Sequence, residues 1–68
     1  MILLTINGLE IELENNTTVQ DYLHIHGLAG HKALAVARNG MVLTKKEHPG
    51  TLLLDGDVIE IVRAIGGG

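Results

Sequence analysis

The chain of 68 residues contains no cysteine, and no serine occurs anywhere in its sequence. These absences exclude a disulfide framework, a thiolate metal site and a mechanism with a cysteine or serine nucleophile. Threonines and carboxylates are the only other candidate nucleophiles. A single domain this small also rarely has room for the walled pocket that most enzymes need. We therefore predict that the protein is not an enzyme.

Aromatic and basic residues are also scarce. With one tyrosine and no phenylalanine or tryptophan, the core must be built from eleven leucines, seven isoleucines and five valines, a set that favours strands. The net charge of −3 argues against a nucleic acid partner. The longest apolar run, residues 33–37, is far below the roughly 20 residues that a bilayer requires, and the N-terminus lacks the charged region of a signal peptide. We expect no membrane partner and a cytoplasmic location.

Two Asn-Gly pairs predict two β-hairpins. Asn7-Gly8 separates the apolar segments 2–6 and 9–13, and Asn-Gly is typical of the type I′ turn, in which both central residues have positive φ. The two-residue loop predicts three apolar pairs on one side of the hairpin: Ile6 with Leu9, Leu4 with Ile11, and Ile2 with Leu13. Asn39-Gly40 predicts the second hairpin, between 33–38 and 41–43.

One short helix is predicted between the hairpins. Thr18 is the expected N-cap, with Asp21 three residues later. A single helical stripe is formed by Val19, Tyr22, Leu23 and His26. Gly27 can end the helix in the left-handed conformation, with Leu28 packing back on Leu23.

Three elements are predicted in the C-terminal third of the chain. Residues 45–50 form a loop or a single 3₁₀ turn, Asp55-Gly56-Asp57 forms a tight turn, and residues 58–65 form the final strand. That strand is apolar on both faces, as in a central strand. If the first and last strands meet in mid-sheet, they are parallel, and the helix covers one face. The expected fold is an α+β roll with a mixed sheet of 4–5 strands, comprising residues 1–65, followed by a flexible tail, 66–68.

The histidines and carboxylates give little support for a metal or catalytic site. His24 and His26 point to different sides of a helix, and His31 and His48 lie in predicted loops without a partner at ligand spacing. We expect them to be solvated or at helix ends. Glu10, Glu12 and Glu14 alternate along a strand and are expected to keep its exposed face soluble.

The C-terminal glycines offer a different chemistry. A terminal carboxyl group becomes an acyl donor once it is joined to AMP from ATP. Residues without Cβ atoms can thread a narrow channel in another enzyme, which suits Gly66, Gly67 and Gly68. The alternative is a frayed terminus without function.

The whole chain resembles the ThiS family of thiamine-biosynthesis sulfur carriers, which have the ubiquitin-like β-grasp fold. The resemblance rests on the order and spacing of several segments: the Asn7-Gly8 hairpin, Thr18-Val19, residues 35–40, Asp55-Gly56-Asp57 and residues 61–68. It implies that a ThiF-like enzyme adenylates Gly68, which is then converted to a thiocarboxylate. The sulfur would come from a donor through a desulfurase and pass to the thiazole synthase ThiG. No cofactor is expected on the chain itself; its partners would use ATP and the sulfur donor.

A docking surface is predicted on the outer face of the sheet. Leu3 and Val62 are expected side by side if the first and last strands are neighbours, with Glu10, Glu12 and Glu60 around them. An apolar patch with a polar rim is typical of a protein interface, and Ile65 is assigned to the same partner-binding set. We interpret this patch as the contact for the activating enzyme and the synthase.

Two other functions remain open from the sequence. The small subunit of molybdopterin synthase resembles this chain in its fold and its Gly-Gly terminus, but is typically longer and has an aromatic or proline-bearing approach to the tail. A non-catalytic β-grasp binding module, such as an RNA-associated domain, shares an Asp-Gly-Asp turn, although the acidic balance here is unfavourable for RNA.

Overall fold

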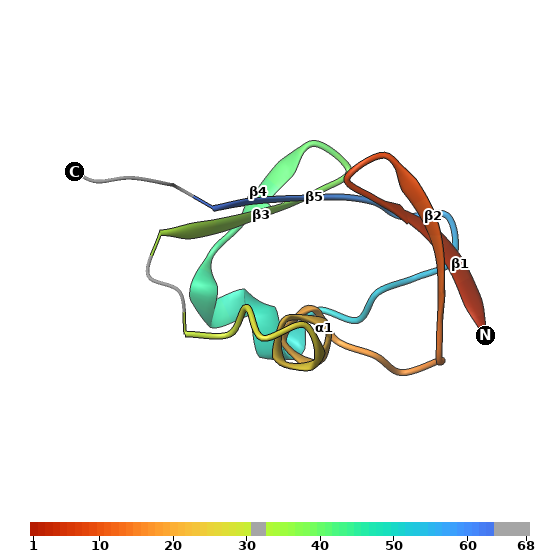
Figure 1. Cartoon of the computed structure of the whole chain (residues 1–68), viewed down its shortest axis with the longest axis horizontal. Helices are drawn as coiled ribbons and strands as arrows, with labels where there is room; N and C mark the ends of the chain where they lie inside the picture. The colour runs from red at the N-terminus through yellow and green to blue at the C-terminus, as the bar shows by residue number, and fades with distance from the viewer. Residues whose placement is uncertain (31–32, 64–68) are drawn as a thin grey trace.

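The computed structural model describes residues 1–30 and 33–63 as a sheet with two helices packed against one of its faces (Figure 1). The strands are β1 (Ile2–Ile6), β2 (Leu9–Leu13), β3 (Leu34–Arg38), β4 (Met41–Leu43) and β5 (Val58–Arg63). The helices are α1 (Val19–Ile25) and the 3₁₀ helix η1 (Lys45–Gly50). The strand order is β2-β1-β5-β3-β4. This arrangement confirms the α+β prediction.

Both predicted hairpins are present. β1 and β2 pair antiparallel in the predicted register, including Ile2 with Leu13 and Ile6 with Leu9, and β3 pairs with β4 through Ala37 and Val42. Both Asn-Gly pairs have the positive φ angles of type I′ turns: 51° at Asn7, 82° at Gly8, 50° at Asn39 and 87° at Gly40. These short turns explain why the local register was predictable.

β5 occupies the centre of the sheet, as predicted. It runs parallel to β1 and antiparallel to β3. Only one of its faces is covered, because Ile59 is buried whereas Val58 and Val62 are exposed. The last two residues of the predicted strand, and the predicted boundary between the domain and the tail, lie outside the described residues.

α1 begins and ends as its capping residues predict. The Thr18 hydroxyl accepts from the Asp21 N–H, and the Asp21 carboxylate accepts from the Thr18 N–H, which completes a capping box. At the other end, the N–H of Leu28 donates to the Leu23 carbonyl at 2.7 Å and that of Gly27 to the His24 carbonyl. These two bonds form the predicted Schellman motif. His26 departs from the predicted stripe: it is exposed, and its ring lies 4.3 Å from that of Tyr22.

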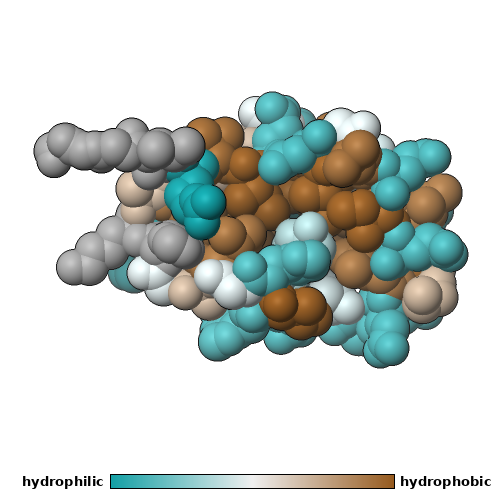
Figure 2. All heavy atoms as spheres, viewed as in Figure 1, coloured by the Kyte–Doolittle hydropathy of each residue, from teal (hydrophilic) through white to brown (hydrophobic). Residues whose placement is uncertain are grey.

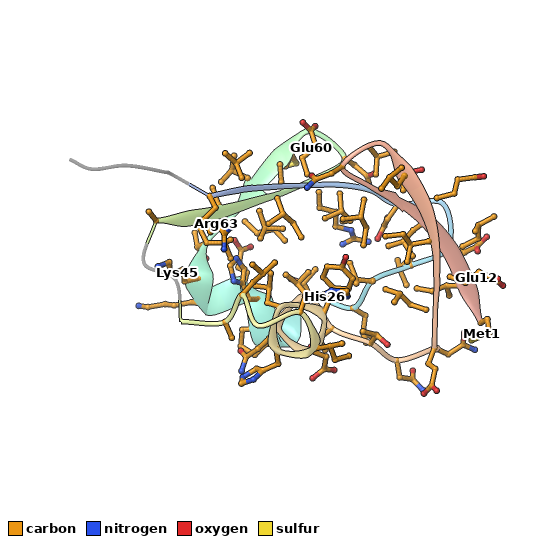
Figure 3. The ribbon with its side chains drawn as sticks, viewed as in Figure 1. Met1, Glu12, His26, Lys45, Glu60 and Arg63 are labelled. Carbon is orange, nitrogen blue, oxygen red and sulfur yellow. The ribbon has the colours of Figure 1, made fainter. Side chains whose placement is uncertain are left out.

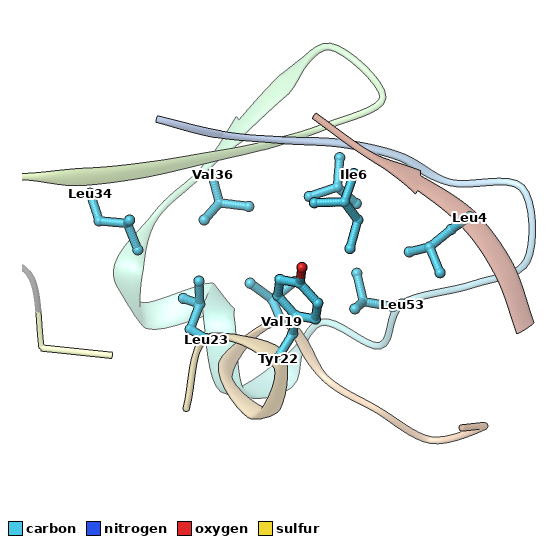
Figure 4. Close-up of a cluster of buried hydrophobic side chains, with 9 residues drawn as sticks. Leu4, Ile6, Val19, Tyr22, Leu23, Leu34, Val36 and Leu53 are labelled. Atoms are coloured by element: carbon cyan, nitrogen blue, oxygen red, sulfur yellow. The ribbon is translucent and has the colours of Figure 1, made fainter. Parts of the chain in front are cut away.

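The core lies between the sheet and the helices (Figure 4). Among residues 1–30 and 33–63, its buried hydrophobic side chains are those of Leu4, Ile6, Val19, Tyr22, Leu23, Leu34, Val36, Leu53 and Ile59. In Figure 2, hydrophobic side chains gather in the middle of the same view, between the sheet and α1. Neither helix of the described segments combines the length and the apolar character needed to cross a membrane.

η1 forms where a loop or 3₁₀ turn was predicted, and His48 lies in its last turn, which is one of the two predicted placements, but the residue is buried rather than solvated. η1 packs against α1, and this contact leaves His48 only 7% exposed. Because the packing partner is distant in sequence, the polar composition of residues 45–50 did not reveal it.

Candidate functional site

The candidate site is the outer face of β5 together with the tail that follows this strand. Arg63 is the last residue of β5 that the structure describes. Ile65, Gly66, Gly67 and Gly68 lie outside the described residues, so their predicted roles remain predictions. What the structure describes is how β5, the strand leading to them, is held.

The Asp55-Gly56-Asp57 turn joins the start of β5 to β1. The N–H of Leu3 donates to Asp55 Oδ1 at 2.7 Å, and the N–H of Gly56 donates to the Leu3 carbonyl at 2.8 Å. Gly56 has φ +85°, a conformation that residues with a side chain rarely adopt. The turn therefore sets where β5 begins relative to β1.

Asp57 anchors the same turn to the β3–β4 hairpin. Its Oδ2 accepts from Arg38 Nε at 3.0 Å and from the Leu54 N–H at 2.9 Å, while Oδ1 accepts from Asn39 Nδ2 at 3.1 Å. Burial by itself would raise the pKa of Asp57, but these hydrogen bonds and the Arg38 charge outweigh it and hold that pKa below its ordinary value. The sequence predicted the turn but not Arg38 as its partner.

The two turn asparagines also bind β5 with their side chains. Asn7 Oδ1 accepts from the Ile61 N–H at 2.8 Å, and its Nδ2 donates to the Ile61 carbonyl at 3.2 Å. Asn39 Oδ1 accepts from the Val58 N–H at 2.9 Å. Each asparagine side chain therefore hydrogen-bonds to the backbone of β5 beyond the residue at which β1 or β3 ends. β5 is consequently held along both edges.

The predicted contact between Leu3 and Val62 is wrong. Thr5 is the partner of Val58 in the parallel β1–β5 pair; Leu3 precedes Thr5 by two residues, and Val62 follows Val58 by four. At about 3.3 Å per residue, this places them about 20 Å apart along the strands. No short turn links β1 to β5, so nothing local in the sequence reveals their register.

The outer face instead brings together residues of three strands. Val62 pairs with Ala35, Glu60 pairs with Ala37, and Ala37 also pairs with Val42. Val42 is 72% and Val62 62% exposed, and Figure 3 shows Glu60 directed away from the helices. We call Ala35, Ala37, Val42 and Val62, with Glu60 among them, the outer patch. Sequence reasoning missed the two alanines and Val42, although alanines alternate with buried residues in β3.

Comparison with known proteins agrees with this architecture. The sequence model described as "ThiS family" matches residues 3–68. The chain belongs to the ThiS family. The family match covers the strands, the helix and the glycine terminus together, and favours the thiamine pathway over the molybdopterin synthase alternative.

Individual ThiS proteins match over nearly their whole length. The chain is 37% identical to the sulfur carrier protein ThiS of Bacillus subtilis (strain 168) over 67 residues, which is 97% of this chain and 100% of that protein. The crystal structure of the thiamine biosynthesis protein ThiS from Geobacter metallireducens matches with a TM-score of 0.81 at 29% identity, covering 98% of this chain and 100% of that chain. An NMR structure of a thiamine biosynthesis protein from the same organism matches with a TM-score of 0.77 at 29% identity, covering 98% and 88%.

These matches establish both the fold and the general function of this ThiS family member. The fold is the predicted ubiquitin-like β-grasp. The protein is a small sulfur carrier of thiamine biosynthesis.

Proposed function

We propose that this protein carries sulfur on the terminal carboxyl group of Gly68. A ThiF-like adenylyltransferase joins that carboxylate to the AMP portion of ATP and releases pyrophosphate. Sulfide-level sulfur then displaces AMP and leaves a thiocarboxylate, which the thiazole synthase ThiG consumes. Where a desulfurase supplies the sulfur from a donor as a persulfide, a thiol reductant provides the two electrons. ATP and the sulfur donor are bound by these partners rather than by the carrier. The proposal places these steps in the cytoplasm.

The observation that carries this proposal is the anchoring of β5, which leads to the glycine terminus. The hydrogen bonds that Asp57 accepts from Arg38, Asn39 and the Leu54 N–H, which we call the Asp57 cluster, hold its start. The Asn7 side chain binds Ile61 near its end. A strand held in this way has a fixed position up to Arg63, the residue after which the tail follows in the sequence. Gly66 and Gly67, lacking Cβ atoms, suit a narrow channel in a partner enzyme.

The outer patch is the surface that we propose for partner docking. Val62 and Glu60 lie on it close to the base of the tail, whereas Leu3 lies about 20 Å further along the sheet. A partner that holds the tail in its active site also covers the surface next to the tail. Ile65 completes the proposed contact set between the outer patch and the glycines.

The activation step can be tested by intact mass. The purified chain is incubated with ATP, an activating enzyme and a sulfide source. We expect a mass gain that corresponds to the exchange of one oxygen for one sulfur, with fragmentation placing it at Gly68. A chain whose mass never changes under conditions that load the Bacillus subtilis protein would contradict the proposal.

Docking can be tested by comparing two aspartate substitutions. Val62→Asp is expected to lower kcat/KM for adenylation by about 10- to 100-fold, because it puts a charge into an apolar contact. Leu3→Asp adds the same charge outside the proposed contact, so its kcat/KM is expected to stay near that of the unmodified chain. Equal losses in the two variants would show that the outer patch is not the docking surface. Circular dichroism checks that both variants are folded.

A further inference from the structure

A cleft of about 300 Å³ lies beneath the sheet, on the face opposite the outer patch. It is bounded by α1, the segment after α1, the start of β3 and η1. Leu23 and Leu34 contribute apolar walls, and Gln20, His24, Lys45 and His48 contribute polar groups. Its volume is at the lower end of the roughly 300–1,000 Å³ typical of ligand pockets and well above what a single water molecule needs.

His48 is the unusual member of this cleft. The residue is 7% exposed, and its Nε2 atom is buried without a hydrogen-bond partner in the described part of the chain. A buried polar atom without a partner costs free energy, and such atoms in native proteins commonly meet a water molecule or a ligand. The orphaned nitrogen therefore marks a position at this cleft where a water molecule or a polar ligand can supply the missing hydrogen bond.

The charges around the cleft indicate the class of ligand. Lys45 lines it from η1, and Arg63 is the strand partner of Leu34 on the same face of the sheet. Figure 3 shows Arg63 and Lys45 at one end of the molecule, with Met1 and Glu12 at the opposite end. Among the described lining residues none is a carboxylate. The two cations favour an anion, and the described residues contain no group of three or more His, Cys, Asp or Glu that could hold a metal ion.

We propose that this cleft is a binding site for a small oxyanion, held by Lys45, His24 and His48. Two different molecules can provide this oxyanion. One is a free oxyanion such as inorganic phosphate. The other is the protein's own terminal carboxylate, since Gly68 follows Arg63 by five residues and an extended segment of that length spans up to about 17 Å. The site does not depend on the proposed sulfur chemistry.

The imidazole resonances of the ¹⁵N-labelled full-length chain provide a direct test. The chain is titrated with sodium phosphate, with sodium chloride at matched ionic strength as the reference, because general screening affects all charges. The same titration is run on a chain of identical sequence that ends in a carboxamide. If a free oxyanion is the ligand, phosphate shifts His24 and His48 saturably and equally in both chains. If the terminal carboxylate occupies the cleft, the two chains differ before phosphate is added, and the carboxamide chain binds phosphate more tightly.

Matched lysine variants make the test specific. Lys45→Met is expected to weaken phosphate binding by about tenfold, the loss of one charge-assisted contact. Lys46→Met removes the same charge from a neighbour that does not line the cleft and should leave binding unchanged. His24→Ala, at an exposed position of α1, should weaken binding without unfolding the chain. Equal effects of the two lysine variants, or no saturable shift and no difference between the carboxylate and carboxamide chains, would overturn the proposal.

Discussion

Replacing Asp57 with alanine is expected to lower the free energy of unfolding by about 3–5 kcal/mol, because three donors lose a buried acceptor and each donor left without a partner costs about 1–3 kcal/mol. Asp57 is 5% exposed and accepts hydrogen bonds from Arg38, Asn39 and the Leu54 N–H. All three donors lose their acceptor in the variant. A domain below about 70–80 residues has only about 3–5 kcal/mol of stability from its core. The variant should therefore be largely unfolded at 25 °C, as urea titration followed by circular dichroism would show.

Two substitutions control for the position and the shape of this side chain. Asp55→Ala removes a carboxylate from the same turn, but Asp55 is exposed and accepts one backbone hydrogen bond, from Leu3, so a cost of about 1 kcal/mol is expected. Asp57→Asn keeps the shape of the side chain and one acceptor oxygen, but its NH₂ group faces a second donor and cannot accept from it. We therefore expect a loss of stability between those of Asp55→Ala and Asp57→Ala. If Asp57→Ala were no more destabilising than Asp55→Ala, the anchoring role of the Asp57 cluster would be wrong.

The same cluster predicts the response to acid. The pKa of Asp57 is lower in the folded chain than its ordinary value of about 3.9. Its contribution to stability is therefore fully present above that value and is lost as the pH falls toward the folded pKa. Glu47, whose pKa is lowered mainly by the Thr44 N–H, acts in the same direction. The unmodified chain should lose more stability between pH 5 and pH 2 than Asp57→Asn does, as urea titration at each pH would show.

A chain ending in a carboxamide instead of a carboxylate is expected to show no adenylation at all. Formation of the acyl adenylate needs a carboxylate oxygen to attack the α-phosphorus of ATP, and an amide at Gly68 provides no such nucleophile. Release of pyrophosphate and the mass gain should both fall below detection. Because the core is built from residues 4–59, the amide chain should keep the folded amide spectrum and the unfolding midpoint of the unmodified chain.

One further chain separates the need for a carboxylate from the need for glycine. Adding a single alanine after Gly68 restores a terminal carboxylate, but moves it one residue outward and gives it a Cβ atom. We expect loading to fall by at least about a hundredfold, because misplacing the reacting group by about an ångström can already cost that much. Sulfur loading of the carboxamide chain would refute the proposed chemistry, whereas normal loading of the alanine-extended chain would refute only the requirement for glycine.

Local physical chemistry explains why much of the fold was predictable from the sequence. Asn7-Gly8 permits a two-residue turn, and such a turn allows only one antiparallel register for β1 and β2. Thr18, Asp21 and Gly27 predict both ends of α1 because capping is a matter of side chains and backbone angles within a few residues. The apolar pattern of residues 58–65 likewise predicted a central strand, and β5 occupies that position.

The sequence by itself therefore determined the hairpins, the helix, the order of the elements and the glycine terminus, since each of these depends on neighbours along the chain. Only the tertiary structure decided how distant segments align. It placed Leu3 about 20 Å from Val62, buried His48 under α1, and turned the Asn7 side chain onto Ile61. Parallel strands and packed helices have no short loop to set their register, so their alignment follows from the packing of the whole core.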